Sequence, residues 1–244
     1  MAQHYGPHMV TDELVFCLDA ADKASYSGSI QGGVVTTWTD LSGYGNNGTL
    51  NHGPTFDSGN CGSIVFDGSN DNVQVNAAGV IRDLFDGGGT WVAWIKPLSD
   101  GENNQGRIMD KSSEGQWRVQ GESGGNLEMF FYIGFSGDDG HWSTTSAVVP
   151  VGEWSHVAVT YDNGAVTNNP SFYRNGALIS AITEDQTPTG TRVSESNNLF
   201  IMGNLANPTR ALDGNIAQVV LYNKVLSLAE VSQNYNAQRA RFGV

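Results

Sequence analysis

Three aspartates stand in loop-like contexts that bring oxygen atoms together: Asp67, Asp71 and Asp213. Hard cations such as Ca²⁺ take carboxylate and backbone oxygens as ligands, so these residues form the candidate metal site and calcium is the candidate cofactor. The alternative interpretation is structural. In Asp67-Gly68 and Asp213-Gly214 the Asp side chain can accept a hydrogen bond from its own backbone while Gly takes a positive φ, which makes a turn without a metal.

Three aromatic residues form a second candidate site. A sugar stacks its apolar face on an aromatic ring while neighbouring amides and carboxylates bind its hydroxyls. In the segment 127–133 (LEMFFYI), the two-residue period of a strand directs Phe130 and Tyr132 away from the face that carries Leu127 and Met129. With Trp142 in GDDGHWSTT, these are the carbohydrate-binding candidates. Alternatively, the rings pack under a neighbouring loop or against another subunit.

No set of residues predicts a catalytic centre. Glu184 and Asp185 are adjacent, so in an extended strand they would face opposite sides, and the Thr/Pro-rich context predicts a loop. His156 lies in EWSHVAVTYD without a Ser or Cys nucleophile motif, which favours a packed, hydrogen-bonded strand residue over a general base. Ser112 and Ser113 lack the context of a nucleophile elbow. We therefore predict that the protein is not an enzyme.

Short apolar segments separated by Gly, Asn, Asp and Ser predict a chain built mainly from strands. The predicted strands lie within 14–18, 63–66, 72–75, 90–96, 106–109, 116–119, 127–133, 153–161, 171–174, 198–202 and 215–222. Asn175-Gly176 predicts a type I′ hairpin turn, because these residues tolerate two positive φ angles. Ser227 and Glu230 form a capping-box pattern that predicts a short C-terminal helix.

Four segments together resemble the laminin G-like branch of the concanavalin A-like lectin/glucanase superfamily, in the order found in that family. They are Phe66-Asp-Gly-Ser-Asn-Asp-Asn-Val-Gln-Val75, Thr90-Trp-Val-Ala-Trp-Ile-Lys-Pro97, Glu153-Trp-Ser-His-Val-Ala-Val-Thr-Tyr-Asp162 and Asp213-Gly-Asn-Ile through Leu226-Ser-Leu-Ala-Glu230. The resemblance implies an all-β fold, a two-sheet antiparallel jelly-roll sandwich with a short C-terminal helix. We expect an N-terminal arm over residues 1–10 and one sandwich domain over 11–244.

The sequence departs from the family in two places. Ala217 and Gln218 replace an acidic pair, which weakens any transfer of the partner interactions that this pair provides in relatives. The glucanases of this fold carry acids at i, i+2 and i+5 of one strand, and no E-x-D-x-x-E occurs here. The family's frequent calcium ion at the sandwich rim agrees with the aspartate site predicted above.

The segment from Leu18 to Leu50 is similar to versions of this domain in bacteriophage virion proteins. It implies a non-enzymatic virion structural protein, such as a capsid decoration, neck or tail component, that displays a lectin-like domain. Its partners would be other virion proteins, surface glycans or both, and it would form a homo-oligomer. A free, calcium-dependent carbohydrate-binding module or adhesin, located outside the cell, is the alternative.

Charge and hydropathy exclude other partners. The chain has 12 basic and 25 acidic residues, a formal charge of −13, so it would repel nucleic acid and anionic membranes. No apolar run is long enough to cross a bilayer, and no signal peptide is apparent. The two cysteines allow one disulfide, although the apolar run around Cys17 predicts a buried free thiol and the loop around Cys61 an exposed residue.

Overall fold

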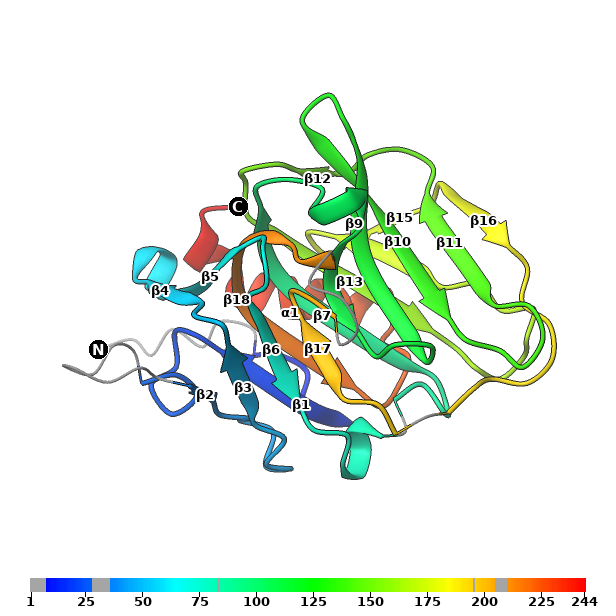
Figure 1. Cartoon of the computed structure of the whole chain (residues 1–244), viewed down its shortest axis with the longest axis horizontal. Coiled ribbons are helices and arrows are strands. Elements are labelled where there is room, and N and C mark those ends of the chain that lie inside the picture. The colour runs from blue at the N-terminus through cyan, green and yellow to red at the C-terminus, as the bar shows by residue number, and fades with distance from the viewer. Residues whose placement is uncertain (1–7, 28–35, 83, 195, 205–209) are drawn as a thin grey trace.

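The computed structural model describes residues 8–27, 36–82, 84–194, 196–204 and 210–244. Two antiparallel sheets pack face to face, and one helix follows the last strand (Figure 1). This arrangement confirms the predicted all-β jelly-roll sandwich with a C-terminal helix. None of the described helices has the length and apolar character needed to cross a bilayer.

Sheet A has eight strands in the described part of the chain. Its order is β15 (Ala177–Ile179), β14 (Ser171–Arg174), β13 (Ser155–Tyr161), β7 (Gly89–Pro97), β18 (Asp213–Tyr222), β5 (Ser63–Asp67) and β4 (Thr55–Asp57), with β1 (Leu14–Asp19) also paired to β18. The β14–β15 hairpin turns at Asn175 and Gly176 with φ of 50° and 74°, which confirms the predicted turn.

Sheet B has ten strands in the same residues. Its order is β16 (Ile182–Gln186), β11 (Gly140–Thr144), β10 (Asn126–Ile133), β9 (Gly115–Ser123), β8 (Gly106–Asp110), β17 (Leu199–Ile201), β6 (Asn72–Val75), β3 (Gly48–Asn51) and β2 (Thr37–Trp38), with β12 (Val149–Pro150) paired to β10. Short 3-10 helices, among them η1 (Gly59–Cys61), η2 (Gly79–Ile81) and η3 (Glu102–Asn104), lie in the connections.

Alternating side chains of both sheets fill the space between them. On β10, Leu127, Met129, Phe131 and Ile133 all lie in the core, as the two-residue period predicts. The Phe131 ring meets the Trp91 ring of β7 edge to face, with centroids 6.1 Å apart, a favoured geometry for aromatic pairs. The main core is therefore the interface between the sheets.

Helix α1 (Leu228–Phe242) covers the outer face of sheet A. Its N-terminus has the predicted capping box between Ser227 and Glu230. At its other end the Phe242 ring stacks on Trp94 of β7, with a centroid separation of 4.0 Å. The central strands of sheet A, β13, β7 and β18, are thus buried on both faces.

The described end of the N-terminal arm contacts this helix. The backbone N–H of Val10 donates to Asn234 Oδ1, and Gln233 Nε2 donates to the carbonyl of His8. Both cysteines are free: Cys17 is buried and Cys61 is exposed, as predicted. Burial, with the nearby Asp19 charge, raises the pKa of Cys17 to about 12.

His156 lies fully buried beneath α1, which confirms its interpretation as a packed strand residue. The predicted hydrogen bonding involves its backbone N–H, which donates to Asn175 Oδ1, and not its ring. Its ring meets Trp94 at 5.2 Å and Tyr235 of α1 at 5.9 Å. Neither ring nitrogen has a hydrogen-bond partner among the described residues. Burial lowers the pKa of His156 to about 3, because an apolar environment disfavours the charged imidazolium.

This environment predicts acid sensitivity. Below a pH of about 6.5 the unfolded chain binds a proton at His156 that the folded protein binds only near pH 3, so stability falls as pH falls through this window. We expect His156→Phe to weaken that dependence by up to about one proton per molecule. Urea unfolding of both proteins between pH 7 and pH 4 measures the free energy of unfolding at each pH. If this free energy falls equally with pH in both proteins, His156 is not the cause of the acid sensitivity.

Candidate functional site

The outer face of sheet B carries polar side chains where β3, β6 and β17 run side by side. Leu50 and Val73 point into the core between the sheets. Their neighbours in sequence, Asn51 and Gln74, therefore lie on the opposite face, because successive side chains of a strand alternate. Phe200 of β17 joins them there, since it is the cross-strand partner of Gln74.

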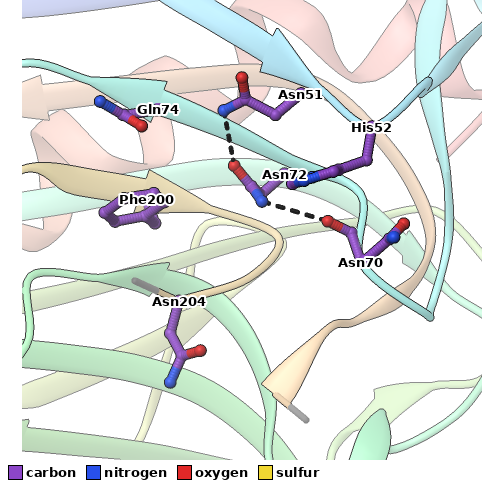
Figure 2. Close-up of a pocket in the computed structure, with 7 residues that line it drawn as sticks. All are labelled: Asn51, His52, Asn70, Asn72, Gln74, Phe200 and Asn204. Atoms are coloured by element: carbon purple, nitrogen blue, oxygen red, sulfur yellow. Dashed lines mark hydrogen bonds between the residues drawn. The ribbon is translucent and has the colours of Figure 1, made fainter. Parts of the chain in front are cut away.

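A groove of about 420 Å³ opens at this place (Figure 2). It is lined by Asn51, His52, Asn70, Asn72, Gln74, Phe200 and Asn204. These residues come from β3 and the turn after it, from β6 and the loop before it, and from β17 and the residues that follow. No Asp, Glu, Lys or Arg is among the described residues that line it.

Hydrogen bonds between its walls hold part of the groove in place. Asn51 Nδ2 donates to Asn72 Oδ1 at 3.0 Å, and Asn72 Nδ2 donates to the backbone oxygen of Asn70 at 3.1 Å (Figure 2). The side-chain amide of Asn70 and the Oε1 atom of Gln74 have no partner in the described structure. The groove therefore offers amide donors and acceptors to a ligand on a fixed frame.

Phe200 supplies the apolar part of the groove. Its ring is only 4% exposed, yet it belongs to the groove lining and not to the core between the sheets. Figure 2 shows the ring on β17 below Gln74 and Asn72. A mostly buried ring among several amides is a mixed apolar and polar surface, which suits a small polyhydroxylated molecule better than an ion.

A family model described as the concanavalin A-like lectin/glucanases superfamily (Laminin_G_3) matches residues 67–232. The chain belongs to this superfamily. No curated protein sequence matches it.

Solved structures of the same fold include binding domains and an enzyme. The binding domain of Paraclostridial Mosquitocidal Protein 1 aligns with a TM-score of 0.67 and 16% identity, over 93% of this chain and 52% of that one. Domain 4 of AbnA, an extracellular GH43 arabinanase from Geobacillus stearothermophilus, was solved in complex with arabinotriose. It aligns with a TM-score of 0.62 and 16% identity, over 91% of this chain and 98% of that one. Trypanosoma rangeli sialidase, solved with the inhibitor DANA, aligns with a TM-score of 0.58 and 13% identity, over 93% of this chain and 33% of that one. This chain thus spans about half the length of the mosquitocidal chain it matches.

Two of the predicted carbohydrate-binding residues lie on the outer face of sheet B, away from the groove. The Arg118 guanidinium lies 3.6 Å from the centroid of the Phe130 ring, and Phe130 is buried. Tyr132 is half-buried, with its ring 5.2 Å from that of His141. The outward direction predicted for both rings is therefore observed, but Arg118 covers the ring of Phe130.

The third predicted residue, Trp142, is fully buried between the sheets. Its Nε1 donates to Asn169 Oδ1 at 2.7 Å, and its ring lies 5.8 Å from that of Tyr161. The sugar-stacking surface predicted at Trp142 is therefore not observed, because β11 begins at Gly140 and directs this side chain inward. The structure therefore brings Phe130 and Tyr132 onto one face and leaves Trp142 in the core.

The three predicted calcium ligands lie near one another at the ends of β5 and β18. Asp67 and Asp213 are cross-strand partners, and the Asp67 N–H donates to Asp71 Oδ2 at 3.2 Å. Asp67 Oδ1 accepts from the Ser69 N–H, as the turn interpretation predicts. No three His, Cys, Asp or Glu side chains in the described ranges are arranged to hold a metal. Calcium at these aspartates stays a prediction.

The residues weighed for catalysis lie apart from the groove. Glu184 and Asp185 belong to the edge strand β16, so the loop predicted for them is wrong. Pairing of β16 with β11 outweighs the Thr- and Pro-rich pattern. Ser112 lies in the turn between β8 and β9, where its N–H donates to Asp110 Oδ1.

The residues of the groove were missed by sequence reasoning. Asparagine is common in turns, so the sequence around Asn51 and Asn70 predicts loops and not a binding site. The available signal is Asn72-Val73-Gln74-Val75, in which amides alternate with valines. Such alternation indicates a strand with an amide-bearing outer face, but it does not reveal which other strands lie beside it.

Asp213 offers a test of the aspartate cluster. Burial, followed by the charge of Asp67, raises the pKa of Asp213. The folded protein thus binds a proton at the Asp213 carboxyl more tightly than the unfolded chain does. The stability that this protonation contributes is lost as the pH rises through the pKa of Asp213 in the folded protein. At pH 7 in EDTA, we expect Asp213→Asn to raise the midpoint of thermal unfolding, with Asp100→Asn as the control.

The same pair of proteins tests for calcium. If the three aspartates bind Ca²⁺, added CaCl₂ raises the unfolding midpoint of the unmodified protein and raises that of Asp213→Asn much less, because a ligand that binds only the folded state stabilises it. An equal response of both proteins would exclude calcium binding through Asp213. A lower midpoint for Asp213→Asn in EDTA would contradict the charge repulsion.

Proposed function

We propose that this domain is a non-enzymatic glycan-binding module that holds its ligand in the amide-lined groove on the outer face of sheet B. The observation that carries the proposal is the composition of the groove, which combines five amide side chains with Phe200 and has no described lining residue of fixed charge. A sugar presents hydroxyls that both donate and accept, and each amide also does both. Sugars also carry apolar C–H faces, which an aromatic ring can contact.

The comparisons support this proposal at the level of the fold. Domain 4 of the arabinanase AbnA was solved with arabinotriose, and this chain covers 98% of that domain. The mosquitocidal protein shares the fold through its binding domain. A binding role agrees with the groove because glycoside hydrolysis generally requires two carboxyl groups on either side of the scissile bond, and the described lining contains none.

Gln74→Ala tests the groove directly. Gln74 lies on β6, and in the described structure its side chain makes one hydrogen bond, to Asn76 at 3.5 Å, so its removal should leave the fold intact. We expect glycan affinity to fall about tenfold, which corresponds to about 1.4 kcal/mol of hydrogen bonding. A glycan array followed by isothermal titration calorimetry measures the loss.

Asn236→Ala on α1 is the matched control, because Asn236 is exposed and α1 covers the other sheet. It should bind as tightly as the unmodified protein. Binding that survives Gln74→Ala and Asn72→Ala together would exclude the groove, and an array without any bound glycan would contradict the function itself.

We further propose that the domain is displayed on a virion, as a capsid decoration, neck or tail component, where it forms homo-oligomers with copies of itself. The resemblance of residues 18–50 to domains of bacteriophage virion proteins supports this location. A free extracellular lectin or adhesin is the alternative, and it uses the same groove.

Particles purified from lysates of the source distinguish these locations. Mass spectrometry and cryo-electron microscopy should find the chain at a fixed copy number per particle if it is a virion component. If the chain is absent from particles and present in the surrounding medium, the free lectin is correct.

A further inference from the structure

A second groove lies next to the first on the same face of sheet B. Its volume is about 400 Å³. It is lined by Thr37, Gly45, Asn46, Asn47, Thr49, Asn76 and Ala78. As in the first groove, the described lining consists of amides, hydroxyls and small residues without a fixed charge.

The two grooves are joined through Gln74. Gln74 lines the first groove, and its cross-strand partner on β3 is Thr49 of the second. Gln74 Nε2 also donates to Asn76 Oδ1, which belongs to the second groove, at 3.5 Å. From Asn72 to Asn76 the chain advances about 13 Å at strand spacing. The grooves therefore form one polar track that is longer than a single sugar ring.

One wall of the second groove is held by the buried carboxylate of Asp40. Asp40 Oδ1 accepts from the Cys17 N–H at 2.9 Å, and Oδ2 accepts from the Asn46 N–H at 3.0 Å. In return, the Asp40 N–H donates to Asn47 Oδ1 at 2.9 Å. The loop that carries Asn46 and Asn47 is thus fixed before any ligand arrives, which lowers the entropy cost of binding.

The same loop exposes an aromatic ring. Tyr44 is 58% exposed, more than any other large hydrophobic side chain in the described residues. It lies between Gly43 and Gly45, whose φ angles of 93° and 73° favour glycine, and Gly45 itself lines the second groove. Tyr44 does not itself line the groove, but it is one residue from Gly45, which does, and its exposed ring provides a surface on which a sugar ring can stack.

We infer that the ligand is a linear oligosaccharide of uncharged sugars that occupies both grooves at once, with one sugar ring stacked on Tyr44. This inference rests on the proposed function and specifies its ligand. The neutral lining selects against acidic sugars, because a carboxylate in either groove would lose water without meeting a cation. The continuous track selects an extended chain over a single terminal sugar.

Ladders of neutral oligosaccharides test the inference. Arabinose, xylose, glucose, mannose and galactose oligomers of one to six units are titrated by calorimetry, with oligogalacturonates of the same lengths as the charged series. For at least one neutral ladder, we expect affinity to rise with length to a plateau, at least tenfold above the monosaccharide. The oligogalacturonates should bind more weakly at every length.

Variants assign that gain to the second groove. Tyr44→Ala and Asn76→Ala should each lower the affinity of the longest oligomers by roughly three- to tenfold and leave the shortest bound oligomer unchanged. Tyr44→Phe keeps the ring and should retain the affinity, and Asn236→Ala on α1 serves as the control for folding and surface changes. Gln74→Ala should weaken oligomers of every length.

The outcomes separate the inference from the proposed function. If short and long oligomers bind equally, if acidic oligomers bind more tightly, or if only branched glycans of the array bind, the linear neutral ligand is wrong while glycan binding stands. The same follows if Tyr44→Ala and Asn76→Ala do not change the length dependence. If neither the ladders nor the array bind, the glycan-binding function itself fails.

Discussion

Burial of sheet A on both of its faces is the constraint on which the rest of the structure depends. Strand β7 lies near its centre and is buried along almost its whole length. Trp91 faces the core between the sheets, whereas Trp94 lies beneath α1 against Phe242. Because helix and core together cover both faces of the central strands of sheet A, the broad sheet face left for polar residues in the described part of the chain is the outer face of sheet B.

That outer face is divided by charge. Over β8 and β9 it carries Arg107, which is buried and paired with Asp110 at 2.7 Å, and Arg118 above Phe130. Burial, with the like charges of Arg107 and Arg210, lowers the pKa of Arg118 to about 9. Over β2, β3, β6 and β17 the described groove linings have no fixed charge. The outer face of sheet B thus has a region with arginines next to a region without fixed charge, and both grooves lie in the second region.

The sequence predicted the fold well because its signals are local. Alternation in segment 127–133, the Asn175-Gly176 turn and the Ser227 capping box each depend on neighbours in the chain, and all are present in the structure. The site depends on register between distant strands: residues 51, 72 and 200 meet only because β3 and β17 both pair with β6. Similarly, the burial of Trp142 depends on the pairing of β11 with β10 and β16, which its own segment does not encode.

The two grooves owe their shape to different kinds of support. The first is built on strands, and the hydrogen bond between Asn51 and Asn72 joins two of them, so the positions of its side chains are set by the pairing of β3 with β6. The second adds a loop that Asp40 fixes to β1 by accepting from the Cys17 N–H. The side chains of Ser42 and Asn46 also donate to the carbonyl of Val15 on β1. Strand-borne amides therefore set which hydroxyl patterns fit, because their positions are tied to the core. The loop with its exposed Tyr44 adds contact area, and as a surface loop it tolerates changes of sequence better than the strands do, provided that its hydrogen bonds to β1 are kept.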